Sequence, residues 1–417
     1  MRSSRPREGI SGFDGLRAIA ALTVLSYHVA LANGLTRAGW LAPAWSELKG
    51  GVAIFFVISG ALLYLPYARA VRDRTGLPDW RGYARRRAVR ILPAYWVALT
   101  VVAVGPFHAR VLGADAGSYY GLSQIYLPRT LFGGIGVAWS LCVEMTFYAL
   151  LPLFAALAAR LATGRGGPTA ARTQIALIAA AGLGSLALRY VIAGSVRAPT
   201  GGATLMVSLP GLMDWFAVGM SLAVLRAGLE ARDSRSAWTH AVGRRPGWCA
   251  LLALGAFAAG LPWQHGDTFL PWYGVATHIA LGVGSGLLVL SVIVPRPDAA
   301  RSRRRVLSHP LLTWVGTISY SIYLWHLSVL QLIAPHLAHS GSLAAAALTW
   351  LAVVGGAVAC GAASWYFVER PLQRLFAARR RDQTGGGTPG HMTESHVAVQ
   401  STVDPLNSSR VAVDHLA

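Results

Sequence analysis

The sequence has few charged side chains. Asp, Glu, Lys and Arg make up 13% of its 417 residues, whereas hydrophobic residues make up 54%. Soluble domains carry about a quarter charged residues, so this composition excludes an ordinary soluble fold of this length. Lysine is almost missing: Lys49 is the only one, and arginine supplies nearly all of the positive charge.

Cysteine is scarce as well. Cys142, Cys249 and Cys360 each lie inside an apolar stretch, without CxxC or metal-type spacing. This arrangement excludes a disulfide framework and a zinc site of the usual spacing, and we expect the three thiols to be packing residues. His336 and His339 have a spacing that can bind a metal, but no further ligands lie near them in the sequence, so a solvated loop and no metal are expected.

A removable signal peptide is not evident. The first apolar run carries Asp14 and Arg17 and lacks a small-residue cleavage site, so we expect it to remain as the first membrane helix. Acidic residues are outnumbered, 17 against 37 Lys and Arg, which gives a formal net charge of +20. That charge lies between apolar segments and not on one folded soluble face, so no nucleic-acid partner is expected.

Long apolar runs fill most of the chain. A helix that crosses a bilayer needs roughly 20 predominantly apolar residues, and such stretches recur from residue 13 to residue 369. We therefore predict an all-α polytopic membrane protein with about ten transmembrane helices. The predicted spans are 13–31, 50–67, 91–108, 135–159, 174–192, 210–225, 247–262, 271–294, 310–333 and 343–367.

The arginines alternate between the two sides of these spans. The segment 68–90 is rich in arginine, as are the loops after the fourth, sixth and eighth spans. By the positive-inside rule, these loops and both termini are cytoplasmic. The opposite side carries only Arg37, Lys49, Arg110, Arg129, Arg189 and Arg197. We expect a multi-pass protein of the inner (cytoplasmic) membrane of the cell.

This topology also divides the chain into parts. Residues 1–12 form a cytoplasmic N-terminus, and residues 13–369 form the transmembrane domain. Residues 370–417 are expected to be a basic and then disordered cytoplasmic tail, because 382–417 lack apolar periodicity. Both termini are cytoplasmic in this arrangement.

The first span contains three ionisable side chains, Asp14, Arg17 and His28. A charge within the hydrocarbon costs roughly 2.5–3.5 kcal/mol even on lenient scales, so each calls for a partner or a function. Arg17 and His28 are about three helical turns apart and share one face, separated by roughly 16 Å. Without a functional role, Arg17 would pair with Asp14 and snorkel, and His28 would be a buried, hydrogen-bonded histidine.

Six sequence blocks, in order along the chain, resemble the signatures of the acyltransferase-3 family of integral membrane O-acyltransferases. They are GFDGLR at 12–17 followed by His28, GVAIFFVISG at 51–60, RRRAVRILPAYW at 85–96, WSLCVEMTFY at 139–148, ISYSIYLWH at 318–326 and FVERPL at 367–372. Two positions depart from the family pattern: Ala53 stands where an acidic residue is often found, and Cys142 where serine is common. Residues 160–300 match only as generic helices.

The resemblance implies an acyl-CoA donor, with acetyl-CoA expected as a co-substrate and no tightly bound cofactor. The acceptor would be a hydroxyl of a sugar, a glycoconjugate or a secondary metabolite. His28 would act in transfer, and Arg87 and Arg90 would bind the donor. This chemistry is reasonable, since a hydroxyl attacking a thioester needs a base of near-neutral pKa and arginine binds phosphates well. The alternative for both arginines is a topogenic role alone.

Other polar side chains in the matching blocks are further candidates. Glu144 and Arg17 would complete the catalytic set, with Glu144 either paired to an arginine or orienting His28; a structural ion pair is the alternative. Asp14, Tyr320 and His326 are candidates for substrate binding, and a structural role for His326 is an equal alternative. Glu369 is expected to cap the last helix.

Two other functions remain open at this stage. A transporter or flippase of lipid-linked sugars would use the same intramembrane charges without cleaving a thioester, and a non-catalytic sensor or scaffold would keep only the fold. The position of His28, roughly 22 Å along its helix, lies beyond the midplane of a ~30 Å hydrocarbon core. An acyltransferase with its base there would deliver the acyl group within or outside the membrane.

Overall fold

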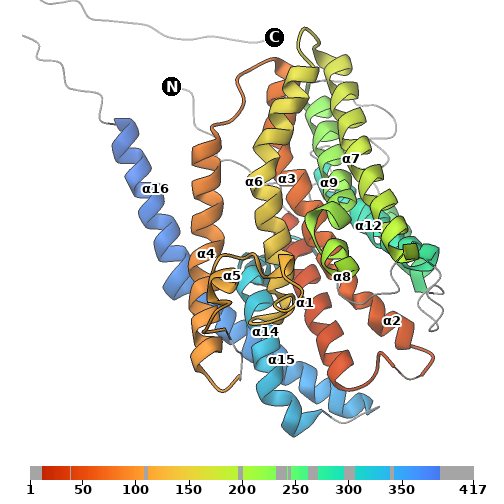
Figure 1. Ribbon diagram of the computed structural model, residues 1–417, viewed down its shortest axis with the longest axis vertical. Coiled ribbons are helices and arrows are strands. Elements are labelled where there is room, and N and C mark those ends of the chain that lie inside the picture. The colour runs from red at the N-terminus through yellow and green to blue at the C-terminus, as the bar shows by residue number, and fades with distance from the viewer. Residues whose placement is uncertain are drawn as a thin grey trace, which may run out of the picture. The chain divides into compact units, whose positions relative to one another are not determined.

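The computed structural model describes residues 12–37, 39–107, 111–195, 201–231, 242, 246–261, 271–294, 306–338 and 342–385. Within these ranges all regular structure is helical, and no strand is present (Figure 1). The prediction of an all-α fold is confirmed.

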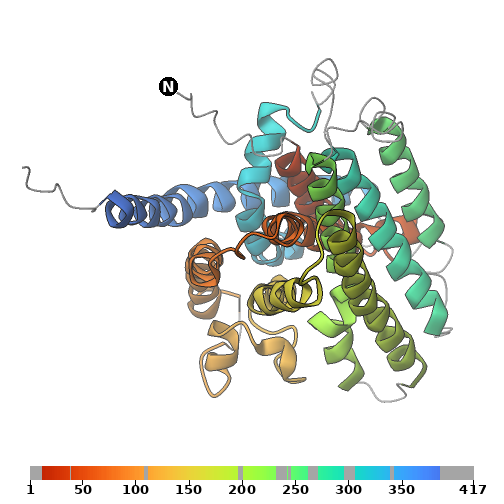
Figure 2. The ribbon, with the colours of Figure 1, turned by 90° about the horizontal axis from the view of Figure 1, so that it is seen from above.

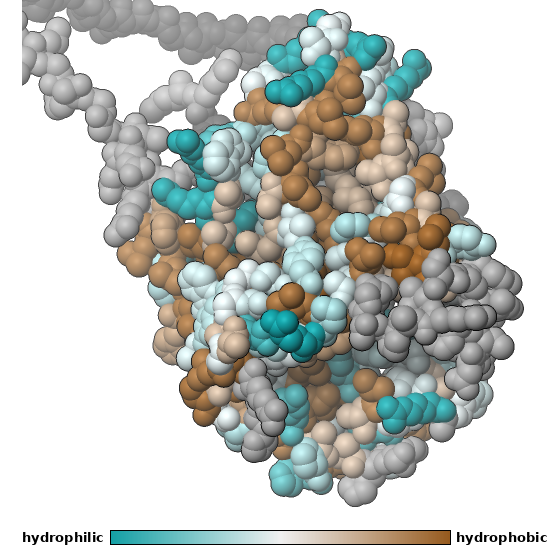
Figure 3. Space-filling view, in the orientation of Figure 1, coloured by the Kyte–Doolittle hydropathy of each residue, from teal (hydrophilic) through white to brown (hydrophobic). Residues whose placement is uncertain are grey.

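Eight of the described helices are long and apolar enough to cross a membrane. Their central segments are α1 (Phe13–Ala32), α3 (Gly51–Asp73), α4 (Trp80–Val104), α6 (Trp139–Leu161), α7 (Gly167–Ser195), α9 (Leu209–Ala231), α12 (Pro271–Ile293) and α15 (Leu343–Ser364). Large apolar side chains such as Leu153 and Leu183 stay about two-thirds exposed, and hydrophobic residues cover broad areas of the visible face (Figure 3). Such a surface suits contact with lipid, as expected of a polytopic membrane protein.

The two remaining predicted spans differ from a continuous membrane helix. The span at 247–262 corresponds to α11 (Pro246–Gly260), which has only 15 residues. The span at 310–333 is divided into α13 (Pro310–Thr317) and α14 (Ser319–Leu337) by a non-helical residue, Ile318. A sequence window averages over such a break, so it could not be seen from hydropathy.

Residues 68–90 were expected to form a loop, and this expectation is wrong for most of them. α3 continues to Asp73 and α4 begins at Trp80. The Asp79 side chain caps α4 by accepting hydrogen bonds from the backbone N–H groups of Arg81 (3.0 Å) and Gly82 (2.8 Å). Arginine is a good helix former, so the helix extends past the apolar run that predicted its start.

Short helical elements connect the long ones. They are α2 (Ala42–Glu47), η1 (Leu48–Gly50), α5 (Ala116–Tyr120), η2 (Gln124–Tyr126), η3 (Gly136–Ala138) and α8 (Gly201–Met206). A π-helical turn, η6 (Trp365–Glu369), follows α15 and leads into α16 (Arg370–Gly385). The tail expected to be disordered from residue 382 therefore begins as helix, and residues 386–417 lie outside the described ranges.

α3 lies in the middle of the bundle, where it contacts α1, α6, α7, α9 and α12 (Figure 2). Its approach to α9 is close because a glycine on each helix lies against the backbone of the other helix. A Cβ atom on Gly60 would lie 2.3 Å from the backbone oxygen of Phe216, and one on Gly219 would lie 2.1 Å from that of Val57. Small residues of this kind allow membrane helices to pack backbone to backbone.

This contact predicts a difference between two glycines of α9. Gly219→Ala should lower the free energy of unfolding by about 1–3 kcal/mol, because the new methyl group overpacks the α3 interface. Gly228→Ala is the matched control, since nothing lies within 4 Å of its Cβ position; it should be neutral or stabilising through helix propensity. Thermal unfolding in detergent measures both, and equal stabilities would contradict the close approach.

Candidate active site

A cavity of about 200 Å³ lies between α1, α3, α4, α6 and α14. It collects most of the polar residues that the sequence blocks singled out, and we call it the arginine cavity. Its polar lining includes Arg17, Arg87, Arg90, Ser59, Glu144, Tyr148 and Tyr320. Three guanidinium groups face one carboxyl group, so the cavity is suited to an anion.

Arg87 and Arg90 reach the arginine cavity from one face of α4, because residues three apart on a helix are neighbours. The Nε atom of Arg87 is buried and has no hydrogen-bond partner among the described residues. Its guanidinium lies over the ring of Tyr148, with 6.0 Å between Cζ and the ring centroid. A buried donor without a partner is costly, so this position favours a bound acceptor group such as a phosphate.

Arg17 forms the local ion pair that its spacing allowed. Its Nη1 donates to Asp14 Oδ1 at 2.9 Å, and the Asp14 side chain is 44% exposed. Arg17 itself lines the arginine cavity, whereas Asp14 is not among the lining residues. The pair therefore anchors Arg17 from outside the cavity and leaves the rest of its guanidinium for a ligand.

Glu144 accepts a hydrogen bond from Ser59 Oγ at 2.6 Å. No ion pair within 4 Å joins it to an arginine of the described chain. No hydrogen bond joins Glu144 to His28 among the described residues, so these contacts do not support the idea that Glu144 orients His28. Its place is in the wall of the arginine cavity.

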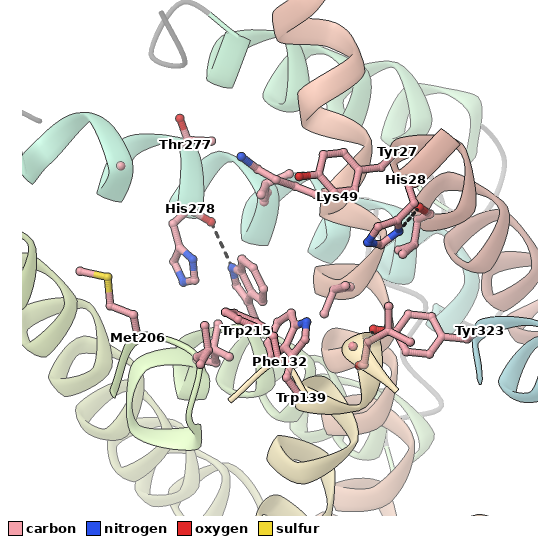
Figure 4. A pocket seen from close by; sticks show the side chains of 18 of the residues that line it. Tyr27, His28, Lys49, Phe132, Trp139, Met206, Trp215, Thr277, His278 and Tyr323 are labelled. Atoms are coloured by element: carbon pink, nitrogen blue, oxygen red, sulfur yellow. Dashed lines mark hydrogen bonds between the residues drawn. The ribbon is translucent and has the colours of Figure 1, made fainter. Parts of the chain in front are cut away.

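A second, larger cavity of about 780 Å³ lies beside the first. We call it the aromatic cavity, because Phe132, Trp139 and Trp215 line it. His28 and Tyr27 of α1 lie on one side of it, and His278 of α12 lies on the other (Figure 4). Its size suits one or two sugar rings or a ligand of similar bulk.

His28 and His326 lie against each other, although 298 residues separate them in the chain. His28 Nδ1 contacts the Val24 carbonyl oxygen at 2.9 Å, and His326 Nδ1 contacts that of Tyr323 at 2.6 Å. A carbonyl oxygen only accepts, so both histidines carry a proton on Nδ1. His326 Nε2, 3.3 Å from His28 Nδ1, then accepts from the same N–H, and His28 Nε2 keeps a lone pair.

The arginine and aromatic cavities are separated by a single layer of side chains. Val52 and Tyr323 line both cavities. The Tyr323 hydroxyl is within 2.8 Å of Ser140 Oγ, and Ser140 lines the arginine cavity. Tyr323 also packs on His326, with ring centroids 5.6 Å apart. The histidine pair thus borders the thin wall between the two cavities.

Two other candidates have different surroundings from those expected. The Tyr320 hydroxyl donates to the Ile91 carbonyl oxygen at 2.8 Å and lies at the arginine cavity, away from the aromatic cavity where His28 lies. Glu369 is only 3% exposed, and its carboxylate accepts a hydrogen bond from Ser321 of α14. It therefore ties the last turns to α14, and the expected local cap is wrong.

The remaining residues considered in the sequence analysis are the three cysteines and the possible metal ligands. Cys142 and Cys249 are buried thiols, and Cys360 is half-buried. The described residues contain no group of three His, Cys, Asp or Glu side chains that could hold a metal. His336 lies at the end of α14, and His339 lies outside the described ranges.

Comparison with known protein sequences shows the family of this chain. YrhL of Bacillus subtilis, provisionally named a peptidoglycan O-acetyltransferase, is 28% identical over 388 residues, covering 87% of this chain and 55% of that protein. The peptidoglycan O-acetyltransferase OatA of Listeria monocytogenes is 25% identical, covering 79% and 50%. The exopolysaccharide production protein ExoZ of Rhizobium meliloti is 30% identical, covering 79% and 91%.

The chain spans about half the length of the two peptidoglycan-related proteins. No solved structure matches it significantly. A family model described as an acyltransferase domain matches residues 10–369, which include both cavities and the histidine pair. The chain therefore belongs to the acyltransferase-3 family of membrane proteins.

Proposed function

We propose that this protein transfers an acetyl or other short acyl group from acyl-CoA to a hydroxyl group of a sugar or glycoconjugate. The observation that supports this function best is the meeting of two chemically different cavities at Val52 and Tyr323, beside the histidine pair. An arginine cavity on one side suits a phosphorylated donor, and an aromatic cavity on the other suits a sugar acceptor. The acyl group then needs to pass only through the thin wall at Tyr323 to reach the acceptor.

The arginine cavity would bind the donor. Its volume of about 200 Å³ holds only part of an acyl-CoA, so the thioester end would enter first. Arg87 and Arg90 would hold the phosphates at the mouth, since guanidinium groups match phosphate geometry. Arg17, anchored by Asp14, would add a third guanidinium group for the negative charge of the donor.

His28 would be the general base. It lines the aromatic cavity and keeps a lone pair on Nε2, which supports a role at the acceptor hydroxyl. As the hydroxyl oxygen attacks the thioester carbonyl carbon, its proton passes to Nε2. The carbon–sulfur bond breaks, the coenzyme A thiolate leaves, and it takes up the proton that His28 Nε2 releases, which restores the neutral imidazole. His326 Nε2, which accepts from His28 Nδ1–H, would position the His28 ring and stabilise the positive charge that develops on it.

The relatives support a sugar polymer as the acceptor, because their names refer to peptidoglycan or exopolysaccharide. Two side chains that the sequence analysis placed on the outer side of the membrane also support delivery of the acyl group away from the cytoplasm. Lys49 and Arg189 line the aromatic cavity, whereas Arg87 and Arg90 line the arginine cavity. By the positive-inside rule the arginine cavity would open to the cytoplasm, in the inner membrane of the cell.

A thioester assay tests the function against its main rival. Purified protein in proteoliposomes should release free coenzyme A from acetyl-CoA when membrane glycans of the source cell are supplied, and alkali-labile acetyl esters should appear on those glycans. A flippase of lipid-linked sugars would move its lipid without releasing coenzyme A. If no coenzyme A is released when acetyl-CoA and the glycans are both supplied, the acyltransferase proposal is contradicted.

The sidedness of the cavities predicts a labelling pattern. Single cysteines introduced at 111–130 should react with a membrane-impermeant maleimide in intact cells, and cysteines at 74–82 should react only after permeabilisation. The reason is the arginine asymmetry between the two sides. Both sets should label equally in detergent, which controls for accessibility. Labelling of 74–82 in intact cells would overturn the arrangement.

A further inference from the structure

A buried Asp–His pair lies in the part of the chain that carries none of the six family blocks. His278 Nε2 of α12 contacts both carboxylate oxygens of Asp214 on α9, at 2.8 and 3.0 Å. Ser185 of α7 donates to Asp214 Oδ1 at 3.2 Å. Asp214 is 8% exposed and His278 is 5% exposed. Three helices are thus joined at one carboxylate, and a packing role alone would already explain the pair.

The surroundings of His278 indicate more than a packing role. Its ring lies flat against Trp215, with centroids 4.2 Å apart and an interplanar angle of 15°, and Trp215 Nε1 donates to the His278 carbonyl oxygen at 3.0 Å. Both side chains line the aromatic cavity, whereas Asp214 is not among its lining residues. Asp214 and Trp215 therefore fix the imidazole in one orientation at the cavity wall.

The second nitrogen of this imidazole, Nδ1, takes no part in the contact with Asp214. Because the carboxylate fixes a proton on Nε2, Nδ1 keeps a lone pair, and no described residue provides a partner for it. Nearly all buried polar groups are hydrogen-bonded in native proteins, so an oriented, unpartnered nitrogen at a cavity wall suits a ligand hydroxyl. By contrast, Arg189 at the same cavity already donates to the carbonyl oxygens of Met206 (2.8 Å) and Gly211 (2.9 and 3.1 Å).

We propose that His278, oriented by Asp214 and Trp215, is the recognition site for a sugar hydroxyl of the acceptor, across the aromatic cavity from His28. Figure 4 shows His278 and His28 on opposite sides of the same open space, with Trp215 and Phe132 between them along one wall. Aromatic rings cover the apolar faces of a sugar, and His278 binds a hydroxyl on a ring other than the one being acylated. This inference rests on the proposed function and names its acceptor class.

The test uses the purified full-length chain in lipid nanodiscs, with radiolabelled acetyl-CoA and two sugar probes, chitotetraose and cellotetraose. Wild type should acetylate at least one probe with saturation. His278→Gln keeps a partner for Asp214 and should raise the KM for that probe about tenfold, the value expected for one lost hydrogen bond of about 1.4 kcal/mol. The KM for acetyl-CoA and the kcat should stay within about twofold.

A second variant leaves the buried pair intact. Met206 lines the same cavity, and Met206→Trp should raise the sugar KM by filling it. Tyr64→Phe is the matched control: it removes a buried interhelical hydrogen bond, from Tyr64 to Gln174 at 3.0 Å, and Tyr64 does not line the aromatic cavity. It should leave both KM values unchanged.

The outcomes separate this inference from the proposed function. An unchanged sugar KM in His278→Gln, or a fall in kcat alone, would overturn recognition by His278. Equal losses for donor and sugar would assign the pair to stability and also overturn it. If wild type acetylates glycans of the source membrane but neither probe, the KM comparison is made with those glycans, and an unchanged KM in His278→Gln overturns recognition by His278. Acetyl-CoA that is neither bound nor cleaved in any condition would instead refute the proposed function.

Discussion

His28→Ala is expected to lower acyl transfer by about 10²–10⁴-fold, the usual contribution of a general base. The reason is geometric. His28 Nδ1 is held by the Val24 carbonyl oxygen at 2.9 Å, so Nε2 is the only nitrogen left to take a proton, and His28 lies on the wall of the aromatic cavity. Acetyl-CoA binding should stay within a few-fold, because the phosphates would be held by arginines elsewhere.

The measurement is transfer by purified protein in proteoliposomes, with acceptor supplied on each side separately. His336→Ala is the matched control, since it removes an exposed imidazole from α14 and should leave the rate unchanged. Near-normal turnover of the His28 variant would refute its role as base. Transfer by wild type only to acceptor on the cytoplasmic side would refute the proposed direction of delivery.

His326→Ala provides a graded comparison within the same pair. It removes the neighbour that lies 3.3 Å from His28 Nδ1 but leaves the contact to Val24. A positioning role predicts a smaller loss of kcat than for His28→Ala, together with an altered pH–rate profile, because the charge on His28 loses its neighbour. A loss as large as that of His28→Ala without a change in the profile would point to a structural role.

Local features of the site could be read from the sequence. The pairing of Arg17 with Asp14 depends on a spacing of three residues within one helix, which helical geometry alone determines. The apolar segments also follow from local composition, since each needs only its own length and hydropathy. The family blocks also singled out four residues that line one cavity in the structure: Arg17, Arg87, Arg90 and Glu144.

Contacts between distant helices could not be read in this way. His28 meets His326 because α1 packs against α13 and α14, and a single sequence contains no signal for that packing. The same limit applies to Glu144, whose hydrogen bond goes to Ser59 on α3. Asp214 and His278 were missed for a further reason. Each is the only Asp, Glu, His, Lys or Arg within its predicted span and matches no motif, although an isolated ionisable residue in a membrane span was itself a usable signal.

Replacing both Arg87 and Arg90 with glutamine is expected to weaken acetyl-CoA binding by about 10²-fold. Each charge-assisted hydrogen bond to a phosphate contributes roughly 1.5–3 kcal/mol, and a tenfold change in affinity corresponds to about 1.4 kcal/mol. Both side chains line the arginine cavity. The buried, unpartnered Nε of Arg87 would gain its partner only when the donor is bound, so its loss should cost the complex more than the free protein.

Arg81→Gln/Arg85→Gln is the charge-matched control for this double variant. It removes the same formal charge from the same helix, but both side chains are exposed and neither lines the arginine cavity. Equilibrium binding of acetyl-CoA to each purified protein, repeated at two salt concentrations, separates direct phosphate contacts from the general field, because screening weakens exposed charges most. The control should lose only a few-fold in affinity, and that loss should vanish at high salt, whereas the Arg87/Arg90 deficit should persist. Equal affinities in the two double variants would leave Arg87 and Arg90 with a topogenic role alone and would remove the donor from this cavity.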